Sequence, residues 1–474
     1  MTMDDGATAA GFALVPLTVF DKLFERTTFV TGWLVEGKVD ASALATALDR
    51  VTQKWRMLSG RLQSVKERNG VKWMLKIPLG PLPPDYPTYS LTISTSSVPL
   101  SKYVPIPLPT VSLSPPPSIF LHASTPRQYT AWESTNHPLT CWQLTYFPAS
   151  QNGGVDYTCI GFARSHGIFD GGGAAQIMNA LVAEMNGREW MIPPRLVEGM
   201  NVNLLEEVLA RESLVENPSK NDEGHVGYTT INLAGFLKLV AGHLIERFWS
   251  GAERRIVLMP KTVLNLLVQE VLRGEQKDVE RVTTGDILVA WIFKTVYSTG
   301  TNSNAMVHCS NLASFRALLA TEIPEALTFP HNVFVPLAYP VLPVAEVNAM
   351  SLTALTELFA ASRASLSLDH VLAARELLQN PCFPNPPNAD ETMMVSNVSA
   401  SRILESDWSA VGSKRTICSY RYQATPTGVM FTNAVYISGR LGDKSVVLDV
   451  TLNKMKIELL LREIRRLEAE VGKN

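Results

Sequence analysis

The stretch Ser165-His166-Gly167-Ile168-Phe169-Asp170-Gly171 separates a segment of strand character from a segment of helical character. Before it, Val155–Arg164 is rich in β-branched and aromatic side chains, which is typical of a buried strand. After it, Ala174–Asn186 places its apolar side chains on one face of a helix. Side chains at a strand end in an open α/β sheet project into clefts, so we expect the catalytic candidate His166 to lie in one.

His166 is the candidate general base of this stretch. A neutral imidazole has a pKa suited to taking a proton from a hydroxyl group near pH 7. The nucleophile can then be the substrate itself, so the protein need not supply a serine or a cysteine. Gly171 and Gly172 lack a Cβ atom and would let a ligand approach the backbone closely. Taken alone, the same pattern also fits a core histidine followed by an aspartate that caps a helix.

The composition is that of a folded protein that takes a small, largely apolar ligand. The chain has 474 residues, 46% of them hydrophobic and 18% charged, and this length favours two domains. Its 42 basic and 44 acidic residues give a net charge of -2, so no basic surplus supports nucleic-acid binding. The five cysteines are scattered and form no CxxC pair, which argues against disulfides and a metal site and indicates a reducing compartment.

The apolar segments of the chain predict a cytosolic protein. The N-terminus begins acidic and lacks the basic and apolar regions of a secretory signal. No uninterrupted apolar run reaches membrane-spanning length. The segment Leu233–Trp249 is amphipathic and rich in aromatic residues. We expect it to pack on the core of the protein, with a membrane-surface or lid helix as the alternative.

Helices and strands alternate in both halves, which predicts an α/β or α+β fold. We expect a first domain over residues 1–192, a crossover linker over 193–227 with the polar run Glu216–Glu223, and a second domain over 228–474. The Pro- and Ser-rich residues 79–118 predict loops and edge strands. Helices are expected at Asp40–Arg56, Lys261–Leu272, Ile287–Tyr297 and Lys454–Val471, and strands at Val71–Ile77, Ala305–Ser310, Val333–Tyr339, Val429–Ser438 and Ser445–Leu452.

Several segments, in order along the chain, resemble the BAHD acyltransferases, which share the chloramphenicol acetyltransferase fold. The stretch HGIFDG is similar to the HxxxDG signature of that family. The fungal subset, which includes trichothecene O-acetyltransferases, is nearer than the plant subset. Further segments that resemble the family are Val15–Asp21, Trp55–Leu62, Thr284–Trp291 and Asn311–Arg316 followed by Asn332, with His331 where glycine is usual.

The resemblance implies a fold and a reaction. It implies two similar domains, each a mixed sheet flanked by helices, with a tunnel between them and part of residues 375–410 exchanged into the first domain. His166 would deprotonate a hydroxyl or amine of a small secondary metabolite as it attacks the thioester of an acyl-coenzyme A, with acetyl as the expected group. Asp170 would point away from the pocket and hold the loop through Arg316. The resemblance also implies a monomer with no permanently bound cofactor.

Other residues are assigned through the same resemblance. Ser396 and Asn397 would face the tunnel and, with Gly171 and Gly172, contact the coenzyme A donor. The second family signature, DFGWG, has only the degenerate counterpart Asp407-Trp408-Ser409-Ala410-Val411-Gly412, for which a structural role is expected. This departure leaves the base in place and puts ordinary use of coenzyme A in question.

Two other functions stay open at this point. The same fold could promote a cyclisation, dehydration or isomerisation of a polyketide or terpenoid intermediate without coenzyme A, and the degenerate DFGWG segment motivates this alternative. A third hypothesis is a protein that binds a metabolite without converting it, against which the intact His166 and Asp170 argue. The chain has no GxSxG, GxxxxGK[ST], GxGxxG or HExxH motif, so the enzyme classes that depend on these motifs lack their defining residues.

Overall fold

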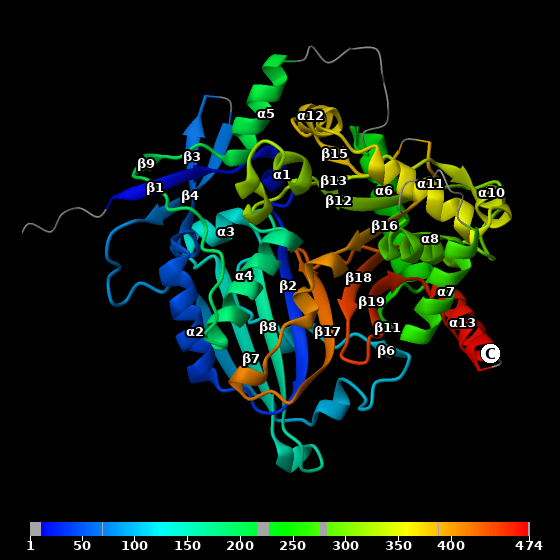
Figure 1. Ribbon diagram of the computed structural model, residues 1–474, viewed down its shortest axis with the longest axis horizontal. Coiled ribbons are helices and arrows are strands. Elements are labelled where there is room, and N and C mark those ends of the chain that lie inside the picture. The colour runs from blue at the N-terminus through cyan, green and yellow to red at the C-terminus, as the bar shows by residue number, and fades with distance from the viewer. Residues whose placement is uncertain are drawn as a thin grey trace, which may run out of the picture.

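A computed structural model of the protein describes residues 11–68, 70–215, 227–230, 232–274, 282–386 and 388–472. The expected polar run Glu216–Glu223 therefore lies wholly outside the described residues, whereas residues 193–215 and 227 of the expected linker are described. Two mixed sheets organise the rest, and helices cover them (Figure 1). The expected combination of mixed sheets and flanking helices is therefore confirmed.

The first sheet is built mainly from the N-terminal half of the chain. Among the described residues it has five strands, in the order β17-β2-β8-β7-β5, and all neighbours are antiparallel except the parallel pair β7 and β5. Its strands are β2 (Thr28–Glu36), β5 (Ser90–Thr95), β7 (Thr140–Phe147), β8 (Tyr157–Ser165) and β17 (Arg415–Ala424).

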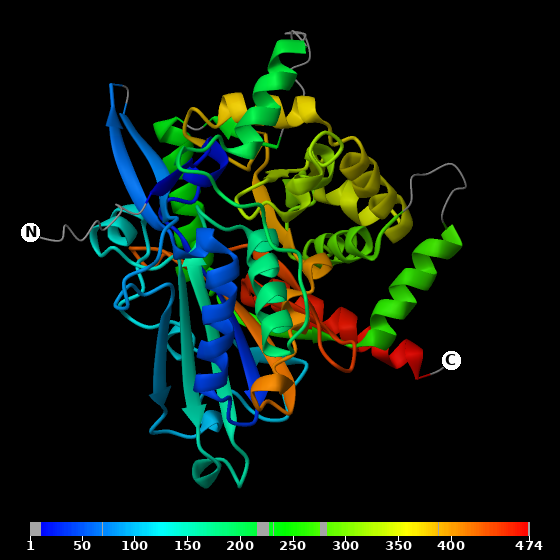
Figure 2. The same ribbon diagram turned by 60° about the vertical axis from the view of Figure 1, so that its left-hand side comes forward.

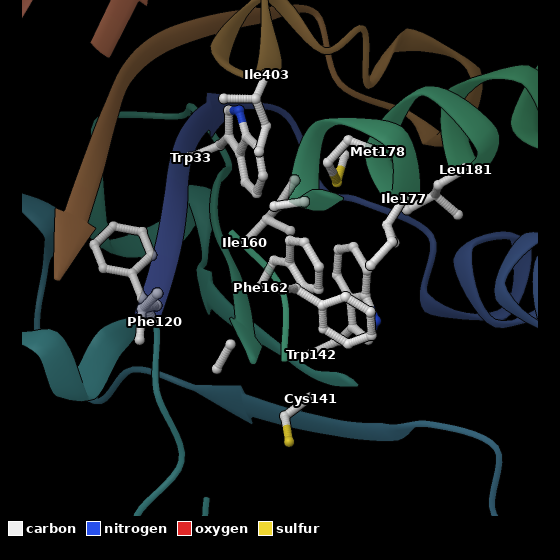
Figure 3. Close-up of a cluster of buried hydrophobic side chains, with 14 of the residues drawn as sticks. Trp33, Phe120, Cys141, Trp142, Ile160, Phe162, Ile177, Met178, Leu181 and Ile403 are labelled. Carbon is white, nitrogen blue, oxygen red and sulfur yellow. The ribbon is translucent and has the colours of Figure 1, made fainter. Parts of the chain in front are cut away.

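Two helices pack against one face of this sheet. Asp40 caps α2 (Ala41–Lys54), as expected, by accepting hydrogen bonds from the N–H groups of Ser42 and Ala43. Figure 2 shows α2 beside α4 (Gly171–Met185) in front of the strands. In Figure 3, Ile177, Met178 and Leu181 of α4 reach toward the stacked rings of Trp142 and Phe162, whose centroids are 4.4 Å apart. This apolar layer supports β8, the strand that ends just before His166.

The second sheet is built mainly from the C-terminal half. In the part of the chain that the structure describes, it runs in the order β13-β12-β16-β18-β19-β11-β6, and β14 also pairs with β12. Its strands are β6 (Val111–Leu113), β11 (Glu253–Met259), β12 (Met306–Ser314), β13 (Phe334–Pro336), β14 (Leu342–Pro343), β16 (Glu391–Asn397), β18 (Ala434–Arg440) and β19 (Val446–Leu452). Its principal helices are α7 (Lys261–Gly274), α8 (Thr284–Val296), α11 (Leu352–Ala364) and α13 (Lys454–Val471), whose apolar faces join one core.

The two halves exchange strands. β17 follows the second-half strand β16 but pairs with β2 in the first sheet, as the orange and blue strands in Figure 1 show. In return, β6 from the Pro- and Ser-rich segment pairs with β11 at the edge of the second sheet. Before β17, Ile403, Leu404 and Trp408 already pack in the first core. The exchanged stretch therefore extends beyond the expected 375–410, because strand pairing carries it to Ala424.

Smaller elements complete the fold. Two small sheets, β3-β4-β1-β9 and β10-β15, lie apart from the main ones within the described ranges. Their strands are β1 (Phe12–Pro16), β3 (Arg61–Glu67), β4 (Gly70–Pro78), β9 (Gly199–Met200), β10 (Thr229–Thr230) and β15 (Cys382–Phe383). The remaining α-helices are α1 (Val19–Lys22), α3 (Tyr129–Ser134), α5 (Leu204–Val215), α6 (Leu233–Leu244), α9 (Arg316–Leu319), α10 (Val344–Ala349) and α12 (Leu368–Leu377).

The expectation that Leu233–Trp249 packs on the core is wrong. None of the residues of α6 or of the π-helical turn after it, Ile245–Trp249, is buried. The contacts that hold the segment are polar: His243 Nδ1 lies 2.6 Å from Thr432 Oγ1, and Glu246 accepts a hydrogen bond from Asn453. The polar face therefore lies against the protein, and Trp249 is 89% exposed. Over the described residues, no helix is long and apolar enough to cross a membrane.

Candidate active site

His166 follows the last residue of β8, and hydrogen bonds hold both its backbone N–H and its backbone carbonyl. Its N–H donates to the carbonyl of Thr27 (2.8 Å), and its carbonyl accepts from Nδ2 of Asn332 (2.9 Å). The imidazole is 9% exposed and stacks on Phe24, with centroids 4.1 Å apart. The ring of Phe29 contacts it at 5.3 Å in a T-shaped arrangement. Backbone and aromatic contacts thus give the ring a defined position.

The surroundings of His166 favour its neutral form. Burial, together with the smaller effect of the positive charge of Arg164, lowers the pKa of His166 to about 4. At neutral pH the imidazole therefore carries no proton on one of its nitrogens and can accept one. This is the protonation state that a general base requires.

The carboxylate of Asp170 accepts hydrogen bonds from other residues of the protein and does not line the pocket of His166. As the N-cap of α4, it accepts a hydrogen bond from the N–H of Gly173 (2.8 Å). Nη2 of Arg316 donates to its Oδ1 (2.7 Å) and Nη1 to its Oδ2 (3.0 Å). Arg316 also donates to the carbonyl of His331 (2.9 Å), so that the loop after His166 is tied to the second half of the chain.

Asp21 and Asn332 form a second buried link to the base, which the sequence did not assign to the site. Oδ1 of Asp21 accepts from the backbone N–H of Asn332 (3.0 Å) and from its Nδ2 (2.9 Å), which also donates to the carbonyl of His166. Burial raises the pKa of Asp21. Both residues stand in segments that resemble the family, but 311 positions separate them, so no local pattern could pair them.

The residues expected to contact the donor have different surroundings. Ser396 lines the pocket that contains His166. Asn397 Oδ1 instead accepts hydrogen bonds from the backbone N–H (3.1 Å) and hydroxyl (2.7 Å) of Ser399. A Cβ atom on Gly171 would lie 3.0 Å from Cγ1 of Val398, and one on Gly172 would lie 2.6 Å from Nη1 of Arg316. The space beside Gly172 is therefore occupied by the arginine that holds Asp170.

Asp407 and Trp408 lie away from the pocket. Trp408 is 1% exposed and its ring packs against Trp33 at 5.2 Å. Asp407 is exposed, and its Oδ1 accepts a hydrogen bond from the N–H of Ser409 (2.9 Å). The degenerate counterpart of the second signature thus supplies a core side chain and a turn.

A pocket of about 180 Å³ opens beside His166, between the two sheets. Most of its walls are apolar, and Thr27, Ser396 and Gln423 add polar groups. Its apolar and aromatic lining includes Phe24, Phe29, Leu312, Phe334, Met394, Phe431 and Tyr436. A larger cavity of about 1180 Å³ reaches Trp55, Asn203 and His331, but His166 is not part of its lining. The small pocket is the one in which His166 can meet a ligand.

The overall fold of the chain is similar to that of two solved proteins, the trichothecene acetyltransferase TRI101 and vinorine synthase. F. graminearum TRI101, solved with coenzyme A and deoxynivalenol, matches with a TM-score of 0.61 over 95% of this chain and 97% of that chain, at 13% identity. Vinorine synthase matches with a TM-score of 0.55 over 98% of this chain and 95% of that chain, at 12% identity. The expected fold class and the two-domain architecture are confirmed.

A relative of known activity is also found by sequence. The O-acyltransferase pboC of Aspergillus ustus is 26% identical over 235 residues, which are 48% of this chain and 45% of that protein. This chain thus spans about half the length of that relative. No model of a known protein family matches the chain. The relatives agree with the resemblance that HGIFDG and the other segments indicated.

Proposed function

We propose that this protein transfers an acyl group, with acetyl as the first expectation, from acyl-coenzyme A to a hydroxyl group of a small secondary metabolite. The observation that carries the proposal is the neutral, buried imidazole of His166 in the wall of a mostly apolar pocket. The fold, the O-acyltransferase relative and the coenzyme A bound to TRI101 support it.

His166 would act first as base and then as acid. Its imidazole takes the proton of the acceptor hydroxyl as the oxygen attacks the thioester carbonyl. The tetrahedral intermediate then collapses, the C–S bond breaks, and the imidazolium returns the proton to the leaving thiolate of coenzyme A. The hydroxyl of Ser396, which lines the same pocket, would donate to the oxyanion of the intermediate. Asp170 and Arg316 would keep the loop in place without touching the reacting atoms.

Substitution of His166 tests this assignment. We expect His166→Ala to lower kcat of acetyl transfer by a factor of about 100 to 10,000, as loss of a general base does. Product would be followed by mass spectrometry with candidate acceptors and acetyl-coenzyme A, beside Arg415→Gln as an exposed control on β17. Turnover within a few-fold of the unmodified protein would contradict the assignment.

The same assay separates the alternatives. Conversion of an acceptor without acetyl-coenzyme A would favour the cyclisation, dehydration or isomerisation hypothesis, and binding without a change of ligand mass would favour the metabolite binder. The packing of Trp408 on Trp33, away from the pocket, supports the acyltransfer hypothesis, because the degenerate segment then removes no group beside His166.

The proposal includes three broader expectations. The domain division at residues 193–227 is supported by the sheets on either side of it, which exchange only β17 and β6 among the described strands. A cytosolic location is supported by the five cysteines, all of which are unpaired and buried. The protein is expected to be a monomer, which size-exclusion chromatography with light scattering would test.

A further inference from the structure

Two buried arginines that the proposed reaction does not use lie on the His166 side of the first sheet. Arg164 lies near the end of β8, two positions before His166, and Arg421 lies on the exchanged strand β17. They are 2% and 3% exposed. Their guanidinium carbons lie 5.3 and 5.9 Å from the centroid of the Phe29 ring, whose edge contact with His166 spans 5.3 Å.

Among the described residues, no carboxylate forms an ion pair with either guanidinium group. Nη1 of Arg164 donates to the hydroxyl of Thr31 (3.2 Å), and its Nε has no hydrogen-bond partner among the described residues. Nε of Arg421 likewise has no hydrogen-bond partner among the described residues. Polar groups buried without a partner cost free energy, and unpaired charges cost more.

The nearby carboxylate of Asp449 is already compensated. Arg254 donates to both of its oxygens, with Nε–Oδ1 and Nη2–Oδ2 distances of 2.8 Å. Oδ2 also accepts the backbone N–H of Arg421 (2.9 Å). Burial lowers the pKa of Arg164 to about 9 and that of Arg421 to about 10, so both stay protonated at neutral pH. Asp170, the other carboxylate that acts on Arg164, is paired with Arg316. Arg164, Arg421 and the partly buried Arg254 therefore leave a surplus of positive charge over Asp449.

We propose that Arg164 and Arg421 bind a carboxylate of the acyl acceptor, which is then a small, mainly apolar hydroxy acid. A planar carboxylate matches the planar donor groups of guanidinium and would supply the missing negative charge. The proposal rests on the proposed acyltransfer for the role of the ligand, but the anion site itself follows from the unpaired arginines. Phe29 lines the pocket at His166 and covers both arginines, so its ring must turn aside to let the carboxylate reach them.

The acceptor is a better source of this anion than the donor. With the thioester carbon beside His166, the pantetheine arm keeps the phosphates of coenzyme A far from that histidine. The arginine pair, in contrast, is separated from His166 by a single aromatic ring. An acceptor whose hydroxyl lies at His166 can reach past that ring with a carboxylate of its own.

Binding measurements on the intact protein test the site without requiring turnover. Octanoate, benzoate and 8-hydroxyoctanoate would be compared with their neutral amides by calorimetry at pH 7. We expect at least one carboxylate to bind about tenfold or more tightly than its amide, since charge-assisted hydrogen bonds to a buried anion contribute about that much. If no carboxylate binds more tightly than its amide, the proposal is wrong.

Arginine variants test which residues cause the preference for carboxylates over amides. Arg164→Gln and Arg421→Gln should each abolish the preference for carboxylate, whereas Arg415→Gln, which changes an exposed arginine of the same strand that pairs with Glu36, should preserve it. If the glutamine variants do not fold, Arg421→Lys replaces them in the test. This variant keeps a positive charge and should retain part of the preference for carboxylate. A preference that all arginine variants preserve would overturn the proposal.

The last measurement is the binding of acetyl-coenzyme A to the same variants. Its dissociation constant should be unchanged in Arg164→Gln and Arg421→Gln. Weaker binding of acetyl-coenzyme A, combined with no preference for carboxylates, would assign the arginines to the phosphates of the donor and overturn the acceptor assignment. Carboxylate binding that depends on both arginines, in a protein that transfers no acetyl group, would instead support this site and contradict the proposed function.

Discussion

Arg316, from the second half of the chain, joins Asp170, from the first half, by two parallel hydrogen bonds of 2.7 and 3.0 Å. Both residues are buried, and their positions in the chain differ by 146. Because Arg316 also donates to the carbonyls of Phe329 and His331, its side chain connects the loop after His166 with the loop before β13. The pair is thus one of the buried polar connections between the two halves at the site, beside that of Asn332 with Asp21 and His166.

Asp170→Asn should destabilise the protein while its cap on α4 is preserved. The asparagine can still accept the Gly173 N–H, but Arg316 loses its counter-charge in a buried position, which costs about 3 kcal/mol. Urea unfolding measures the change. Arg466→Gln, which breaks an exposed pair with Glu463, should cost less than about 1 kcal/mol. Equal effects of the two substitutions would contradict the importance assigned to the buried pair.

His166 should make stability depend on pH between about pH 6.5 and pH 4. Its pKa is about 4 in the folded protein and near the ordinary 6.5 in the unfolded chain, so the unfolded chain takes up the proton first as the pH falls. The free energy of unfolding should therefore drop by up to about 3 kcal/mol over this window. The measurement is the difference between the pH profiles of the protein and of His166→Gln. A flat difference would show that burial does not depress this pKa.

Gly173→Ala should prevent stable folding. A Cβ atom at this position would lie 1.8 Å from the carbonyl oxygen of Pro330, which belongs to backbone and cannot turn away. We expect a loss of more than about 3 kcal/mol, or no soluble protein. Gly442→Ala is the matched control, because no atom lies within 4 Å of its Cβ position, and it should change stability by less than about 0.5 kcal/mol. The measurement is the melting temperature of both variants, and a similar melting temperature for the two would contradict the prediction.

Trp408→Ala should cost stability without changing ligand binding. Removal of a fully buried indole from its contact with Trp33 leaves a cavity and costs about 3 to 5 kcal/mol. Asp407→Ala removes one exposed hydrogen bond and should cost less than about 1 kcal/mol. Calorimetry with acetyl-coenzyme A at low temperature should give the same affinity for both variants. A large loss of affinity in Asp407→Ala would show that the segment contacts the donor.

Elements with a regular apolar period were predictable. The helix at Lys454–Val471 has the predicted bounds, and the helix near Asp40 differs by one residue at its start and two at its end. The strand β17 was not predicted. One of its faces is apolar and joins the first core, but its other face carries Ser419 and Arg421, which are buried between the sheets. A strand with a buried polar face lacks the apolar and solvated alternation by which strands are recognised.

The helix α6 shows the opposite failure. Its apolar period predicts a helix correctly, but the same period led to the wrong face. An apolar period shows only that a helix has an apolar face and a polar face. Which face lies against the protein depends on residues elsewhere in the chain, here the hydrogen-bonding partners Thr432 and Asn453.

For the site, local sequence patterns were enough to predict what lies within a few residues of His166. The strand before it, the helix after it and the cap at Asp170 follow from local backbone preferences and short-range hydrogen bonds. Only the tertiary structure decided that Phe29 and Arg421 lie near the base and that Asn332 holds its carbonyl. These residues meet His166 through pairing and packing between remote segments, and such contacts depend on the whole fold rather than on any local pattern.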